Sequence, residues 1–219
     1  MKPWSMDGYI RRRHLLKHPF YIAWSNGELS LETLQDYARQ YYHFESNFPR
    51  YVAGTYAHIQ DQKQRRVLLE NLTDEEGRDP THPELWRRFG EALGVGRREM
   101  IGARAAAPTK RLCSEYETLT LAGSAGSGLG ALYGYESIFP EVAREKSRGL
   151  RAFYGIRSPT AHEFFRVHTE ADVEHSAAER RAIRAEVARS PRSARDVRRG
   201  VERSLDAWWG FLDGFVRSS

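Results

Sequence analysis

The sequence predicts an all-α fold, and three observations lead to that prediction. Apolar side chains recur at intervals of three and four residues through most of the 219-residue chain, the spacing of one helix face. No stretch alternates apolar and polar residues as a half-buried strand does. No internal repeat or low-complexity linker interrupts the pattern, so we expect one domain over residues 1–219. We expect it to contain about seven to nine helices.

The first long helix is expected to begin near Ser30, whose hydroxyl can cap its N-terminus. It presents one apolar face: Leu34, Tyr37, Tyr41, Phe44 and Phe48. A second helix is marked by Leu68, Leu69 and Leu72. A third, shorter helix follows Pro83 and is marked by Leu85, Phe89 and Leu93.

The segment CSEYETLTLAGSAGSGLGALYGYE is rich in small residues, which permit close approach between helices. We expect a buried central helix there, interrupted near Gly126–Gly128. Thr160 and Glu163 fit a capping box at the start of the next helix, beside Pro159. Ser190 and Pro191 break the chain again. The last helix has a clear apolar face: Val201, Leu205, Trp208, Leu212 and Phe215.

The charge and cysteine content exclude several classes of protein. The net charge is +5, but 34 basic residues are interspersed with 29 acidic ones, so we expect a mixed solvated surface and no nucleic-acid binding. No apolar stretch is long enough to span a bilayer, and the first residues lack the apolar core of a signal peptide. A single cysteine, Cys113, excludes an intrachain disulfide and a cysteine-based zinc cluster. We therefore expect a soluble, cytoplasmic protein without membrane partners.

One short stretch, RVHTEADVEHS, has the spacing of a metal site. His168, Asp172 and His175 are separated by four and three residues. On a helix, His175 lies about 20° from His168 around the axis, and Asp172 about 40° the other way. A carboxylate between two imidazoles on one stripe suits iron or manganese better than zinc.

Other acidic and histidine side chains could complete such a site, since dimetal bundles take ligands from several facing helices. Glu75 or Glu76 precedes His82, which stands at the start of a predicted helix. Glu136 lies in an otherwise apolar, small-residue segment, and a buried carboxylate needs a metal or a cation as its partner.

Four stretches, in this order, resemble the haem-oxygenase-like diiron oxidase family: HPFYIAWSNGELSLETLQDYARQYYHF, NLTDEEGRDPTHPELW, YGYESIFPEVAREK and HTEADVEHS. Within the family, the chain is most similar to the branch named for a chlamydial protein associating with death domains. The similarity extends over residues 10–215. It implies a bundle of about seven helices, in agreement with the helical periodicity.

The resemblance also implies a ligand set. The family signature Glu-x6-His, a single Glu and His-x3-Asp-x2-His is matched without a gap and selects Glu75 over Glu76. Glu75, His82 and His168 would hold one iron, and Glu136, Asp172 and His175 a second iron or a manganese. Dioxygen would be the co-substrate, with an external reductant. Homodimers are expected, as for other bundles of this kind.

The same branch is implicated in making p-aminobenzoate, the folate precursor, by consuming its own side chains. A tyrosine supplies the ring and a lysine supplies the amino nitrogen. The residues that match are Tyr21, Tyr37, Tyr135 and Lys146. We expect Tyr21 to be consumed, Tyr37 and Tyr135 to act as relays, and a desolvated Lys146 to offer a free amine.

Other functions remain open at this stage. The dimetal site could oxidise an external amine or an amino-acid-like substrate. An alternative of a different class is that the chain is a death-domain-type interaction module. Such a module has no use for six convergent metal ligands. A thiaminase-like activity would need a nucleophilic cysteine, and Cys113 has no visible activating partner. The cofactor-less pyrroloquinoline-quinone synthases are disfavoured, because this chain keeps the whole ligand set.

Overall fold

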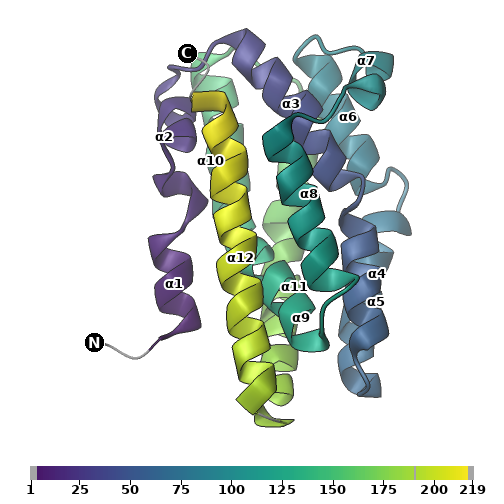
Figure 1. The fold of residues 1–219 in the computed structure, drawn as a ribbon. Helices are drawn as coiled ribbons and strands as arrows, with labels where there is room; N and C mark the ends of the chain where they lie inside the picture. The colour runs from purple at the N-terminus through teal and green to yellow at the C-terminus, as the bar shows by residue number, and fades with distance from the viewer. Residues whose placement is uncertain (1–3, 190, 217–219) are drawn as a thin grey trace.

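The computed structural model describes residues 4–189 and 191–216, and Figure 1 shows their helices running up and down side by side. In chain order the elements are α1 (Met6–Arg12), the 3-10 helix η1 (Leu15–Lys17), α2 (Pro19–Asn26), α3 (Leu31–Glu45), α4 (Phe48–His58), α5 (Gln62–Glu76), α6 (His82–Ala92), α7 (Arg97–Gly102), α8 (Ala107–Thr120), α9 (Ala125–Glu136), α10 (Phe139–Phe153), α11 (Pro159–Arg189) and α12 (Pro191–Val216). No strand occurs among the described residues, so the all-α prediction is confirmed.

The helices are more numerous than expected, because some predicted helices are broken in two. Ser30 caps α3 as predicted, its hydroxyl accepting a hydrogen bond from the Thr33 amide. However, α3 ends at Glu45, and Phe48 belongs to α4. Pro49 explains the break: it has no N–H to donate to the Glu45 carbonyl, and it sits in the first turn of the new helix. Leu68, Leu69 and Leu72 all lie in α5 as predicted, with Leu68 buried and Leu69 49% exposed.

The small-residue segment forms a buried helix, but its break lies earlier than predicted. α8 ends at Thr120 and α9 begins at Ala125, so Gly126 and Gly128 lie inside α9. α9 packs closely against α12. A Cβ atom at Gly130 would overlap the backbone of α12, and one at Gly200 would overlap the backbone of α9. The small residues therefore serve close helix packing and do not interrupt the helix.

The two C-terminal helices form the long spine of the bundle (Figure 1). The predicted capping box of Thr160 and Glu163 is wrong: Ser158 caps α11 by accepting the Ala161 amide, and Thr160 lies within the helix. α12 begins at Pro191 as expected, while Ser190 falls outside the described residues. The five predicted inward residues of α12 are all buried.

The core between these helices is dominated by aromatic side chains. Trp24, Trp86 and Trp208 are completely buried, together with several tyrosines and phenylalanines. Within the described part of the chain, no helix combines the length and apolar character needed to cross a lipid bilayer. The polar groups described next lie inside this aromatic interior.

Candidate metal centre

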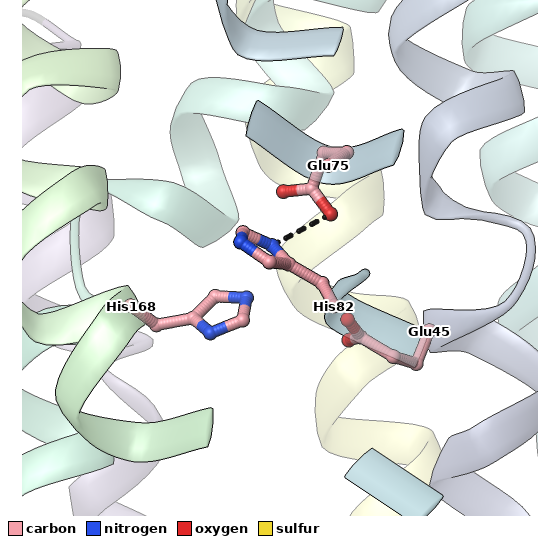
Figure 2. A group of neighbouring side chains, drawn as sticks. All are labelled: Glu45, Glu75, His82 and His168. Carbon is pink, nitrogen blue, oxygen red and sulfur yellow. Dashed lines mark ion pairs between the residues drawn. The ribbon is translucent and has the colours of Figure 1, made fainter. Parts of the chain in front are cut away.

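The first cluster gathers four buried side chains from α3, α5, α6 and α11: Glu45, Glu75, His82 and His168. One nitrogen or oxygen atom of each lies within 4.8 Å of those of the others. Nδ1 of His82 is 2.9 Å from a carboxylate oxygen of Glu75, and the His82 and His168 rings are 4.3 Å apart. Figure 2 shows the four side chains converging on one region. The structure thus brings together three of the predicted ligands and adds Glu45.

Local structure explains how Glu75 and His82 come to face each other. Glu75 is near the end of α5, and His82 is the first residue of α6. Thr81 caps α6 by accepting a hydrogen bond from the amide of Glu84, so the chain turns sharply between the two helices. Glu76, the alternative that the sequence left open, is exposed.

The second cluster comprises the other three predicted ligands, Glu136, Asp172 and His175. Glu136 is the last residue of α9, while Asp172 and His175 lie on α11. Nδ1 of His175 is 3.7 Å from an oxygen of each carboxylate, and the amide nitrogen of Asn71 donates to Glu136 at 2.9 Å. Since His168 belongs to the first cluster, the stripe on α11 serves both.

Both clusters contain buried polar atoms to which residues 4–189 and 191–216 offer no hydrogen-bond partner. They include Oε1 of Glu75, Nε2 of His82, Oε2 of Glu136 and Oδ2 of Asp172. Buried polar atoms without partners are costly and rare in folded proteins. Mixed carboxylate and imidazole donors suit iron and manganese, and two divalent cations would satisfy these atoms together. The residues present therefore fit a dimetal centre.

The charge balance of the clusters points the same way. Burial alone would lower the pKa of His175, but Asp172 and Glu136 outweigh it and raise that pKa to about 11. Burial would likewise lower the pKa of His82, but Glu75 outweighs it and raises that pKa to about 9. Burial raises the pKa of Asp172 to about 7. Protons thus accumulate where carboxylates crowd together, and metal cations would take their place.

Two histidines are held by hydrogen bonds on the side away from the clusters. Nδ1 of His168 is 2.8 Å from the Phe164 carbonyl, so it donates there and leaves Nε2 free. Nε2 of His175 is 3.0 Å from the Asp74 carboxylate, which leaves Nδ1 facing Glu136 and Asp172. Such outer partners fix the tautomer and the ring orientation of metal-binding histidines.

A buried lysine lies next to the first cluster. Lys146 is completely buried on α10, its side-chain nitrogen has no hydrogen-bond partner among the residues that the structure describes, and burial holds its pKa well below the usual range. Nζ is 5.5 Å from the centre of the Tyr21 ring and 5.0 Å from that of Phe139. The Phe139 ring is in turn 5.3 Å from the His168 ring. A single aromatic side chain therefore separates the lysine from the cluster.

The three predicted tyrosines are buried and connected through a fourth. The hydroxyl oxygens of Tyr21 and Tyr37 are 2.9 Å apart. The Tyr37 and Tyr41 rings are 5.6 Å apart, and the Tyr41 hydroxyl is hydrogen-bonded to that of Tyr135. Tyr135 directly precedes Glu136, so a continuous aromatic chain runs from Tyr21 to the second cluster.

Sequence reasoning missed several residues at this site. Glu45 lies in a run of aromatic residues. An acid in such a segment is a signal of a buried, partnered carboxylate, the same signal that identified Glu136. Glu179 continues the stripe one turn beyond His175 and is completely buried beside Glu136, where burial raises its pKa. Asp74 precedes Glu75 and gave no signal of its own. Cys113 has its pKa raised by burial, the opposite of an activated nucleophile.

Comparison with known proteins supports these observations. A family model described as iron-containing redox enzyme matches residues 35–209. A 4-aminobenzoate synthase of Chlamydia pneumoniae is 37% identical over 98% of this chain and 94% of its own. A 4-aminobenzoate synthase of Nitrosomonas europaea is 38% identical over 96% of this chain and 89% of its own.

A solved structure from Shewanella denitrificans, described as having a heme oxygenase-like fold, superposes with a TM-score of 0.81. It covers 97% of this chain and 89% of the other at 17% sequence identity, which establishes the fold alone. The predicted haem-oxygenase-like architecture is therefore confirmed.

Proposed function

Because this chain belongs to the family of iron-containing redox enzymes, we propose that it is an oxygen-dependent dimetal oxidase that makes 4-aminobenzoate. The relatives that carry this activity in their names are similar over nearly its whole length. The observation in the structure that favours the proposal is the buried Lys146 amine, 5.5 Å from the centre of the Tyr21 ring. A redox enzyme acting only on external substrates has no need of a buried, unpaired amine beside a tyrosine.

The two clusters would hold two iron ions, or iron and manganese. Glu75, His82 and His168 would bind one ion, and Glu136, Asp172 and His175 the other. When bound, such a pair supplies the site at which dioxygen is reduced, with electrons from an external reductant. The Glu45 carboxylate would be a fourth candidate ligand in the first cluster.

The carbon count of the product fits tyrosine. 4-Aminobenzoate has a six-membered ring and one carboxyl carbon, which correspond to the ring and Cβ of a tyrosine. Forming it from Tyr21 breaks the bond between Cα and Cβ. In the net reaction one dioxygen molecule would take up four electrons and supply both carboxyl oxygens, a hydrogen would replace the side chain on Cα, and the external reductant would keep the metal ions divalent. Nζ of Lys146 replaces the phenol oxygen, so its bond to Cε breaks as well, and Cε would take the displaced hydroxyl in an exchange without net change of oxidation state. Each chain would therefore react once.

The roles of the other residues follow from their contacts. Burial lowers the pKa of Lys146 and so favours the neutral amine, whose lone pair is available to the ring. The Tyr37 hydroxyl hydrogen-bonds to that of Tyr21 and can exchange a proton with it. Tyr41 fills the gap between Tyr37 and Tyr135, the two expected relays. The aromatic walls around Lys146 exclude water from the reacting groups.

The test is product formation without any added organic substrate. The chain is loaded with Fe(II) under reductant and exposed to air, and the small molecules are assayed for 4-aminobenzoate by mass spectrometry. At most one product molecule per chain is expected, with a mass loss mapped to Tyr21. Tyr21→Phe should give no product, whereas Tyr51→Phe, which alters another fully buried tyrosine, should retain it.

Replacement of Glu136 by Ala is the control for the metal centre. It should lower the metal content and abolish the product, and a normal yield from this variant would overturn the scheme. Product that forms only after an external amine or amino acid is added would assign the centre to an external substrate instead. Binding of a partner protein that persists without metal would indicate an interaction module.

A further inference from the structure

A groove of about 520 Å³ lies between α10 and α11 and is lined by residues of both helices. This volume is within the range of small-molecule sites, about 300–1,000 Å³. Four arginines line it, facing two glutamates: Arg144, Arg148, Arg151 and Arg166 against Glu163 and Glu170. The groove therefore has an excess of positive charge.

Two of these arginines are available to a ligand. Arg148 is bound to Glu145, and Arg166 lies 3.5 Å from Glu170. Arg144 and Arg151 have no ion pair within the part of the chain that the structure describes. They are seven residues apart on α10, two turns along one face, so both guanidinium groups can reach the same groove. A free guanidinium fork is suited to binding a carboxylate or a phosphate.

The floor of the groove also forms a wall of the buried site. Phe165 lines the groove although only 1% of its surface is exposed, and its ring centre is 5.9 Å from Nζ of Lys146. His162, also on the floor, is held by Ser147 and by the Ile156 carbonyl, so neither of its ring nitrogens is free. One phenylalanine ring thus separates the groove from the lysine.

A second, smaller cavity adjoins the metal centre but has the opposite charge balance. It has a volume of about 250 Å³ and includes Asp74, which contacts His175. Three acidic residues face two arginines there: Asp74, Glu170 and Glu174 against Arg78 and Arg166. An organic anion would be disfavoured in this cavity, whereas the α10–α11 groove would attract it.

We propose that the groove between α10 and α11 binds an aromatic carboxylate, and that 4-aminobenzoate leaves the protein through it past Phe165. This inference rests on the proposed function, which creates an aromatic carboxylate within contact distance of Lys146. Arg144 and Arg151 bind the carboxylate, and the ring lies on the floor of the groove beside Phe165. No bond is made or broken in this step.

The test measures binding of added 4-aminobenzoate to the full chain, loaded with Fe(II) and kept free of oxygen so that no synthesis occurs. Equilibrium dialysis is carried out on the wild-type protein and on the double variant Arg144→Gln/Arg151→Gln. The double variant should bind 4-aminobenzoate at least about tenfold more weakly than the wild type does. The matched control is Arg181→Gln/Arg184→Gln, which removes the same charge from exposed positions of α11 outside the groove.

Two further ligands identify what the groove recognises. 4-Aminobenzamide has the same ring without the charge and should bind much more weakly than the acid. Inorganic phosphate tests whether the arginines recognise a phosphate in preference to an aromatic carboxylate. Equal binding of the amide, unchanged binding by the Arg144/Arg151 variant, or preference for phosphate over the aromatic acid would each overturn the proposal.

The outcome is separable from that of the proposed function. A chain that makes no 4-aminobenzoate but binds it through Arg144 and Arg151 would refute the synthesis and leave the groove standing. A chain that makes the product without binding it there would refute the groove alone. In aerobic single turnovers, the Arg144/Arg151 variant should form product in the normal amount and retain less of it during rapid gel filtration.

Discussion

The hydroxyl oxygens of Tyr21 and Tyr37 lie 2.9 Å apart, and both side chains are almost completely buried. Burial raises the pKa of each tyrosine, so both hydroxyls stay protonated and one donates to the other. No other hydrogen-bond partner of the Tyr21 hydroxyl is found among the described residues. Tyr37 is therefore the group that sets the orientation and the proton exchange of the Tyr21 phenol.

We expect Tyr37→Phe to lower the yield of 4-aminobenzoate about tenfold or more, since Tyr21 loses this partner. The free energy of unfolding should fall by about 1–2 kcal/mol, because one buried hydroxyl is left unpaired. Product is measured by mass spectrometry and stability by urea unfolding. A wild-type yield would show that Tyr37 has only a packing role.

Lys146→Met should separate stability from activity. Removing a buried, unpartnered amine and restoring apolar contacts should raise the free energy of unfolding by about 1 kcal/mol or more. The same change removes the nitrogen donor, so no 4-aminobenzoate should form. Lys110→Met, at an exposed position, should change neither quantity appreciably. Continued synthesis by Lys146→Met would exclude this lysine as the donor.

Asp74 is expected to act on the metal centre through His175. Asp74→Ala should weaken metal binding by about 10- to 100-fold, because the His175 ring loses its outer partner. Asp74→Asn keeps an acceptor oxygen and should recover part of the affinity. Competition with a coloured chelator gives both values. Asp74 also pairs with Arg78, so Arg78→Gln is the control, and an equal loss in that variant would assign the effect to the surface pair.

Glu45→Gln tests the carboxylate that the first cluster gains from α3. If this oxygen contacts the metal, the substitution should lower affinity for one of the two ions and change the Mössbauer spectrum of the iron-loaded chain. Glu115→Gln, on α8, leaves the cluster intact and should change neither measurement. An unaltered spectrum in Glu45→Gln would place Glu45 outside the coordination shell.

The fold should lose stability on mild acidification through His162. Burial lowers the pKa of His162, whose ring nitrogens contact the Ser147 hydroxyl and the Ile156 carbonyl. The unfolded chain therefore binds this proton more readily than the folded one. Stability is complete above the unfolded pKa of about 6.5 and falls as the pH drops towards the lower folded value. The melting temperature between pH 7.5 and 5 should fall less in His162→Gln than in the wild type.

The main elements and most of the candidate ligands could be predicted from local patterns, because helical spacing and buried charge leave a local signal, whereas the choice of Glu75 over Glu76 came from the resemblance to the diiron oxidase family. His168, Asp172 and His175 needed only their separations of four and three residues to be placed on one stripe. Glu136 was noticeable because an acid among small and apolar residues requires a partner. The structure gathers these side chains and the predicted Glu75 and His82 into two clusters.

The parts that could not be predicted depend on contacts between distant segments. Glu45 is an acidic residue on a helix, as many surface residues are. It is buried because α3 packs against α6. Asp74 matters because α5 lies beside α11, which no local pattern reveals. Glycines such as Gly130 look like helix breakers until the close approach of α12 is known.

The position of Tyr21 gives the proposed reaction a lasting effect on the protein. Its ring is 1% exposed and packs against Phe20 and Trp24, so the substrate is a piece of the core. Removing a buried aromatic ring typically costs about 3–5 kcal/mol, a large share of the stability of a small domain. A chain that has reacted would unfold more readily and be degraded faster than an unreacted one. The supply of product would then be set by the rate at which ribosomes make new chains.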